Sequence, residues 1–255
     1  ALGFAFGLLS FERPGDFDIK SVQKSLVKIS DKLYASKFEV SNQEYNRFLE
    51  SLKRNNRTEA YHKALMDTAQ WKNILPDGEI FMANYHRHPA FSIYPAVNVH
   101  YEAALLFCDW LTEQYNADPK RPFQQVKFRL PTEEEWIMAA KGGNPKSVYP
   151  WEGNHLRNKR GMYHCNFGRS VDGSGPADGM KDLTAPTKFY IPNGFGLYQM
   201  SGNVAEMLLE KGKTKGGSWQ DSEEAMKIEN DGKYGTYDAP QPTIGFRYFM
   251  DVIEA

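Results

Sequence analysis

The most informative stretch of this sequence is Pro192-Asn-Gly-Phe-Gly-Leu-Tyr-Gln-Met-Ser-Gly-Asn-Val-Ala-Glu206. Its glycines at positions 194, 196 and 202 mark places where the backbone takes a positive φ or approaches another segment closely. Oxygen ligands to a hard cation would help to hold such a loop, and Glu206 follows the last glycine at a spacing that can return a carboxylate to the same turn. The stretch therefore predicts a shaped loop without regular secondary structure.

Upstream of this loop, the sequence predicts three amphipathic helices and a hairpin. Apolar residues recur at helical spacing over residues 41–54, 101–115 and 132–141. The first and third of these segments begin with a serine or threonine followed three residues later by a glutamate, which is the capping-box pattern. Short alternating runs over residues 24–40 predict two strands of a hairpin. Helices beside short strands indicate the α+β class.

The composition favours a single globular domain that does not bind nucleic acid. The chain has 255 residues, with 31 basic against 32 acidic side chains, and it shows no basic cluster interleaved with aromatics. Aromatic residues make up 14% of the chain, and 21 glycines with 14 prolines favour a loop-rich fold. The two cysteines, Cys108 and Cys165, do not assign a compartment, because they can be bridged, free or buried.

The chain divides into an apolar segment, residues 1–13, and a domain, residues 14–255. The run Ala1–Phe11 carries no charge and is too short to span a bilayer alone. It has two interpretations, which the sequence leaves open: the remnant of a signal or anchor that associates with a membrane, or a buried edge strand.

Familiar catalytic and metal-binding patterns are missing from the sequence. His86 and His88 share one side of an extended segment, but no third ligand lies at metal-site spacing, so a solvated or hydrogen-bonded pair is favoured. There is no nucleophile elbow, phosphate-binding loop or Cys-x-x-Cys motif. The acidic residues Asp221, Glu223 and Glu224 are interpreted as a solvated loop in preference to an acid–base pair.

Five motifs in order resemble the formylglycine-generating enzyme, or sulfatase-modifying factor, family. The resemblance spans about residues 25–250 and implies a single C-type-lectin-like α+β domain with little regular secondary structure. The motifs are Phe38-Glu-Val-Ser-Asn-Gln-Glu-Tyr45, Arg129-Leu-Pro-Thr-Glu-Glu-Glu-Trp136, the loop 192–206, Lys215-Gly-Gly-Ser-Trp219 and Ile244-Gly-Phe-Arg-Tyr248.

The resemblance also implies two calcium sites, and we expect calcium at the first of them. Matched to the family's ligands, the first site takes the side chains of Asn166 and Asp178 and the carbonyls of Phe167 and Met180. The second takes Gln199, the carbonyls of Gly202 and Val204, and Glu206. Because Gln199 stands where the family has Asn or Asp, we expect this second site to be weaker or empty. The alternative for each is a hydrogen-bonded polar loop without metal.

The catalytic chemistry of the family is not expected here. The family's oxidases bind copper with two cysteines set five residues apart after the Gly-Gly-Ser motif, and these positions are Asp221 and Met226 in this sequence. Copper(I) prefers soft thiolate ligands, so we expect no copper and no catalytic residues. Cys108 and Cys165 do not match the catalytic positions.

With the family's catalytic chemistry set aside, the other features of the sequence favour a protein-binding role. The segment 221–242 is rich in turn formers and tyrosines, from which we choose Tyr234 and Tyr237 as exposed partner-binding anchors. The chain also resembles cysteine-free members of the family found among gliding-motility and secretion lipoproteins. We therefore expect a non-catalytic scaffold or interaction subunit of a cell-envelope complex, periplasmic or associated with the outer membrane. The alternatives are an enzyme that uses the same cleft and a module that binds saccharide or peptide.

Overall fold

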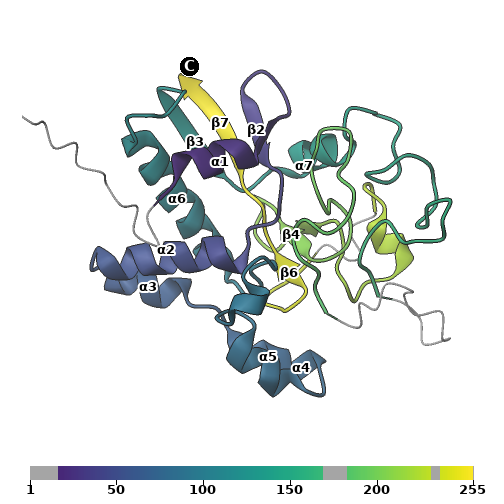
Figure 1. Ribbon diagram of the computed structural model, residues 1–255, viewed down its shortest axis with the longest axis horizontal. Helices are drawn as coiled ribbons and strands as arrows, with labels where there is room; N and C mark the ends of the chain where they lie inside the picture. Colours follow the sequence, from purple (N-terminus) through teal and green to yellow (C-terminus); the bar gives the residue numbers. More distant parts are fainter. Residues whose placement is uncertain (1–16, 169–182, 231–235, 255) are drawn as a thin grey trace, which may run out of the picture.

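Figure 1 shows a computed structural model of the chain, which describes residues 17–168, 183–230 and 236–254. Most helices gather in one half of the molecule, and long loops after residue 141 fill the other half (Figure 1). In the described part, the helices are α1 (Ile19–Ser25), α2 (Asn42–Arg54), α3 (Thr58–Ala64), α4 (Trp71–Ile74), α5 (Gly78–Asn84), α6 (Tyr101–Ala117) and α7 (Glu133–Ala140). The strands are β1 (Leu26–Lys28), β2 (Leu33–Ser36), β3 (Gln125–Arg129), β4 (Ala205–Met207), β5 (Thr214–Lys215), β6 (Ile244–Gly245) and β7 (Phe249–Glu254). This mixture of helices and short strands confirms the α+β class.

The larger sheet has the antiparallel order β1-β2-β7-β3 and separates two apolar layers. Successive side chains of a strand point to opposite faces. On β7, Met250 accordingly packs in the cluster that contains the α6 residues, whereas Phe249 packs with Trp136 of α7. The C-terminal strand thus joins the two halves of the core.

The smaller sheet has the order β5-β4-β6 and joins the end of the glycine-rich loop to the C-terminal motif. Strand β4 pairs antiparallel with β5 and parallel with β6, with Ala205 opposite Ile244 and Glu206 opposite Gly245. The sheet therefore places Glu206 one strand away from the segment that carries Arg247.

The three predicted helices are confirmed. Capping boxes at Ser41 and Thr132 are both formed, with Glu44 and Glu135 as the reciprocal partners. The third helix ends before Gly142 and Gly143, which have φ angles of 58° and 90° and so turn the chain into the loops.

The prediction for residues 24–40 is right in its hairpin but wrong in its extent. Strands β1 and β2 pair antiparallel, yet they are shorter than expected, and Ser25 ends helix α1 instead of beginning a strand. Asp18 is the N-cap residue of helix α1, and its side chain accepts a hydrogen bond from the Lys20 amide. Its seven residues carry too little periodicity to be recognised in the sequence.

Helices α3, α4 and α5 were not predicted, because residues 55–95 lack a regular apolar pattern. They are short, and short helices depend on tertiary packing. Trp71, at the start of α4, lies 4.7 Å from the Tyr85 ring, and Tyr85 lies 5.2 Å from Phe91. This aromatic cluster holds the segment.

The whole segment 1–13, which includes the run Ala1–Phe11, lies outside the described residues, so both interpretations of it stay predictions. Within the described ranges, no helix has the length and apolar character needed to cross a membrane.

Candidate functional site

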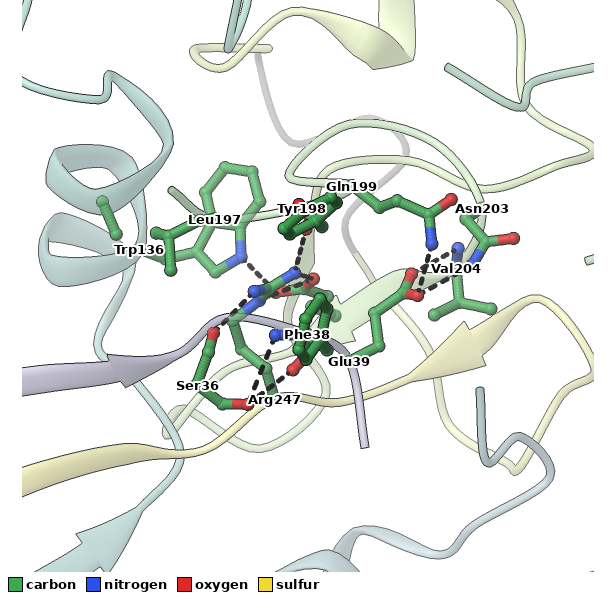
Figure 2. Close-up of polar contacts among 12 residues, drawn as sticks. Ser36, Phe38, Glu39, Trp136, Leu197, Tyr198, Gln199, Asn203, Val204 and Arg247 are labelled. Carbon is green, nitrogen blue, oxygen red and sulfur yellow. Dashed lines mark hydrogen bonds and ion pairs between the residues drawn. The ribbon is translucent and has the colours of Figure 1, made fainter. Parts of the chain in front are cut away.

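Residues from four of the five sequence motifs meet in one buried polar network, which Figure 2 shows. Arg247 is fully buried and forms a salt bridge with Glu206, with Nη2 and Oε1 2.6 Å apart. Its Nε also donates to both Glu206 oxygens, at 2.8 and 2.7 Å. The remaining N–H groups donate to the carbonyls of Ser36 and Tyr198, at 2.8 and 2.7 Å. One side chain therefore ties together β2, the glycine-rich loop and β4.

Helix α7 contributes to the same network through Trp136. Its Nε1 donates to Glu206 Oε2 over 2.7 Å, and the ring itself is fully buried. Both oxygens of Glu206 are thus engaged by Arg247 and Trp136, which satisfies a buried charge that would otherwise be strongly unfavourable.

Glu39 is a second buried carboxylate in the network. It accepts hydrogen bonds from Gln199 Nε2 at 3.0 Å, from Asn203 Nδ2 at 2.7 Å and from the Val204 amide at 3.4 Å. Burial raises the pKa of Glu39 well above its usual value, and the nearby charge of Glu206 raises it further. Its partners in Figure 2 are neutral amides, so this carboxyl group has no ion-pair partner of its own among the described residues.

The glycine-rich loop is held in shape by left-handed backbone conformations. Gly202 has a φ of 75°, and a Cβ at this position would lie 2.2 Å from the carbonyl oxygen of Asn166. Asn203, with a φ of 69°, donates its amide to that same oxygen at 2.7 Å. Its side-chain Oδ1 accepts from the Ala185 amide at 2.6 Å. The loop is therefore fixed against the segments around residues 166 and 185.

The side chains of the second predicted calcium site have other partners in the structure. Glu206 is bound to the Arg247 guanidinium, and a divalent cation at this carboxylate would be repelled by that positive charge. Gln199 donates to Glu39 and to the Pro186 carbonyl, and its Oε1 is buried without a partner among the described residues. Calcium at this second site, formed by Gln199, Gly202, Val204 and Glu206, therefore stays a prediction.

The first predicted calcium site is only partly described. Asp178 and Met180 lie outside the described residues. Asn166 is buried and its Nδ2 donates to the Leu183 carbonyl at 2.8 Å, and Phe167 packs in an apolar cluster. Calcium at this site stays a prediction. No group of three or more metal-ligating side chains occurs within the described ranges.

Asp221 and Met226, which occupy the family's cysteine positions, have separate structural roles. Asp221 Oδ2 accepts from the amide of Ser218 at 2.7 Å and from its hydroxyl at 2.6 Å. Met226 is fully buried, in an apolar cluster that also contains Cys165 and Tyr149. The first is thus a turn-forming carboxylate and the second a core thioether.

Both cysteines are buried. Burial raises the pKa of the Cys108 thiol, which disfavours the reactive thiolate form. Glu223 and Glu224 begin a short 3-10 helix and are exposed, and Glu224 pairs with Lys227 at 2.6 Å. This placement agrees with the interpretation of a solvated acidic loop.

The two histidines do not form a site together. His86 is buried, with Nδ1 3.1 Å from Asn42 Oδ1. His88 is exposed and its Nδ1 accepts from the Ala90 amide at 3.2 Å. The hydrogen-bonded alternative therefore describes this pair.

The predicted anchors differ from expectation. Tyr234 lies outside the described residues. Tyr237 is half-buried rather than exposed, because it packs against the main hydrophobic cluster, and burial raises the pKa of its hydroxyl. Whether either tyrosine binds a partner stays a prediction.

Sequence reasoning missed the roles of Glu39 and Arg247. Both were quoted within motifs, but their charges were not interpreted. The available signal was a charged residue between large apolar neighbours, as in Phe38-Glu-Val40 and Phe246-Arg-Tyr248, since charged side chains in such positions are buried only when paired.

Comparisons with known proteins agree with the motifs. The family model described as sulfatase-modifying factor enzyme 1-like domain matches residues 10–252. The formylglycine-generating enzyme of Thermomonospora curvata is 38% identical over 116 residues, which cover 44% of this chain and 32% of that protein. The inactive C-alpha-formylglycine-generating enzyme 2 of Bos taurus is 32% identical over 113 residues, covering 44% of this chain and 32% of that protein. The matches thus span about a third of the length of these relatives.

Among solved structures, the crystal structure of CarF is similar over most of both chains. It is 20% identical, covers 89% of this chain and 93% of the other, and gives a TM-score of 0.49.

Proposed function

We propose, from the premise that this chain belongs to the family of sulfatase-modifying factor enzyme 1-like domains, that it is a non-catalytic interaction subunit. Family membership confirms the resemblance on which the sequence-based prediction rested. The proposal places the chain in a cell-envelope assembly, such as a secretion or gliding machinery, on the periplasmic side or at the outer membrane. Its partners in this proposal are proteins.

The observation that carries the proposal is the chemistry at the family's cysteine positions. A carboxylate and a thioether lack the paired soft anions that hold copper(I). Asp221 is also committed to the Ser218 turn, and Met226 is enclosed in the core. The residues at these two positions therefore do not fit copper. The name of the Bos taurus relative supports the proposal, because it describes an inactive member of the family.

The structural network supports a scaffold role in the same way. Arg247, Glu206, Trp136 and Glu39 are buried, so they maintain the loop rather than reach a substrate. This chain has the buried network but lacks the two thiols. Because the network fixes the loop, the surface that the loop forms is rigid. Rigid surfaces suit protein recognition, because little ordering is needed on binding.

The test is an oxidation assay with a peptide that carries the sulfatase motif and its cysteine. The purified chain, supplied with copper and oxygen, is expected to form no formylglycine by mass spectrometry and to show no tight copper(I) binding. The Thermomonospora curvata enzyme serves as the positive control. A double variant, Asp221→Cys with Met226→Cys, restores both thiols and is expected to gain copper(I) affinity. Formylglycine formation by the wild-type chain would defeat the proposal.

A second candidate function is enzymatic, with the chemistry located near the family's copper position, and one observation favours it. Cys165 lies in the same apolar cluster as Met226, so one thiol and one thioether occur near the family's copper position. Several relatives are also named as formylglycine-generating enzymes. If this candidate is right, Cys165→Ser abolishes copper(I) binding and Cys108→Ser leaves it unchanged.

A further inference from the structure

A polar cavity of about 240 Å³ lies beside Asp221, at the edge of the smaller sheet. Strands β4, β5 and β6 each contribute one lining residue: Ala205, Thr214 and Ile244. The other walls come from Asp221, Thr236, Gln241 and Thr243. Three threonines, one glutamine and one carboxylate therefore face a space large enough for a single small group.

Several polar atoms around this cavity have capacity for another partner. Asp221 Oδ2 holds Ser218, whereas its Oδ1 accepts no hydrogen bond from any described residue. The side-chain hydroxyl of Thr214, a buried residue, forms no hydrogen bond with another described residue, and neither does that of Thr236. Only Thr243 and Gln241 bond to each other, at 3.3 Å. These oxygens can accept hydrogen bonds from a guest.

The charge of the lining selects the kind of guest. Among the described residues, Asp221 is the charged member of the lining, no lysine, arginine or histidine lines the cavity, and no salt bridge to Asp221 occurs. An anionic group would meet an uncompensated carboxylate, whereas a cationic group would pair with it. A primary ammonium has three N–H donors and no acceptor, which matches a carboxylate oxygen beside hydroxyl oxygens.

The apolar part of the lining fits the rest of a lysine side chain. Ala205 and Ile244 provide apolar surface, and lysine stems commonly pack along such surface while the charged head meets polar groups. No aromatic ring from the described part of the chain lines the cavity, so no described residue covers the face of a sugar ring there.

We propose that this cavity binds the ammonium group of a lysine side chain presented by the protein partner. The inference rests on the proposed function, because it names the chemistry by which the partner is recognised. Asp221 then has a binding role at the position where the family's oxidases have a thiol.

The test follows the methyl resonances of Thr214, Thr236 and Thr243 by nuclear magnetic resonance in the full chain. The probe is Nα-acetyl-lysine methylamide, and its norleucine analogue has the same stem without the charge. We expect saturable shifts of these methyls with the lysine probe. Because a charge-assisted hydrogen bond is lost, we expect binding at least about tenfold weaker with the norleucine probe and with Asp221→Asn.

Matched variants keep the result interpretable. Asparagine at position 221 retains an oxygen for Ser218, and Asp238→Asn, which changes an exposed carboxylate outside the lining, is expected to bind like the wild type. If Asp221→Asn does not fold, Thr214→Val and the comparison of the two probes on the wild-type chain still decide whether the cavity binds an ammonium group. Equal binding of both probes, absence of saturation, or shifts with methyl glucoside but not with lysine would each overturn the proposal.

The outcome is separable from that of the proposed function. Lysine binding by a chain that also forms formylglycine would leave the cavity assignment standing and remove the non-catalytic role. Failure of lysine binding in a chain without oxidase activity would remove only the assignment.

Discussion

Arg247 is the residue on which the glycine-rich loop depends. Its guanidinium meets Glu206, Ser36 and Tyr198 from three separate segments, and the side chains of Arg247 and Glu206 are both buried. A buried ion pair is weak evidence for net stability, but the loss of one partner leaves the other charged and unpaired. The residue therefore fixes the relative positions of β2, β4 and the loop.

We predict that Arg247→Met destabilises the chain by about 3–5 kcal/mol, because Glu206 is left buried without its counter-charge. Urea denaturation of the purified variant measures this loss. Arg57→Met, which removes an exposed pair with Glu113, is the control and is expected to change the free energy of unfolding by less than about 1 kcal/mol. Similar losses in the two variants would contradict the role given to Arg247.

His86 gives a prediction about pH. Burial lowers its pKa from 6.5 to about 3, so the folded state keeps the ring neutral while the unfolded state takes up a proton below pH 6.5. Stability from this group is therefore full above pH 6.5 and is lost as pH falls toward 3.

Between pH 6.5 and 4.5, this effect amounts to about 2.3 kcal/mol in the free energy of unfolding. We expect His86→Asn to lose less stability than the wild type over this interval by about that amount, as measured by urea denaturation at both pH values. His88→Asn, at an exposed site, should follow the wild type. An unchanged pH slope in His86→Asn would exclude His86 as the source.

Among the elements, the glycine-rich loop connects the parts of the core that long strands connect in other folds. The Tyr198 carbonyl in this loop accepts a hydrogen bond from Arg247, and the loop then continues into β4. Its shape depends on close backbone approaches that glycine permits: a Cβ would lie 2.2 Å from a carbonyl oxygen both at Gly202, against Asn166, and at Gly194, against Gly142. Regular hydrogen-bond ladders are replaced there by side-chain amides such as Asn203.

Gly202 and Gly153 provide a matched test of this view. Both have a positive φ, 75° and 86°, but a Cβ meets the Asn166 carbonyl at position 202 and nothing within 4 Å at position 153. Alanine at either site incurs backbone strain of about 1–2 kcal/mol. Gly202→Ala should destabilise by roughly 1–3 kcal/mol more, because of the added steric overlap. Equal melting temperatures of the two variants would show that the close approach is unimportant.

In the molecule as a whole, β7 and Arg247 unite a helical half and a loop-rich half into one core. The helical half has an ordinary aromatic core, in which Phe107 contacts Tyr45, Phe48 and Phe246. The loop-rich half has few strands, so its stability depends on polar networks and, in our prediction, on bound calcium.

We predict that removal of calcium destabilises the whole domain through the first site. At free calcium about a hundred times the Kd, binding stabilises the native state by about 2.7 kcal/mol, and a chelator should remove this amount. The melting temperature with and without chelator measures it. Asp178→Ala should abolish the chelator effect, whereas Asp172→Ala, in the same segment, should retain it. A transition that the chelator leaves unchanged would remove calcium from both predicted sites.

The sequence by itself determined the family, the α+β class and three helices, because capping boxes and apolar periodicity at 41–54 and 132–141 are local signals. It also placed Asp221 and Met226 at the cysteine positions, since motif order is readable along the chain. Only the tertiary structure decided that Glu206 pairs with Arg247. That pair joins residues 41 positions apart, and which carboxylate meets which cation depends on sheet register and burial, neither of which a local pattern specifies.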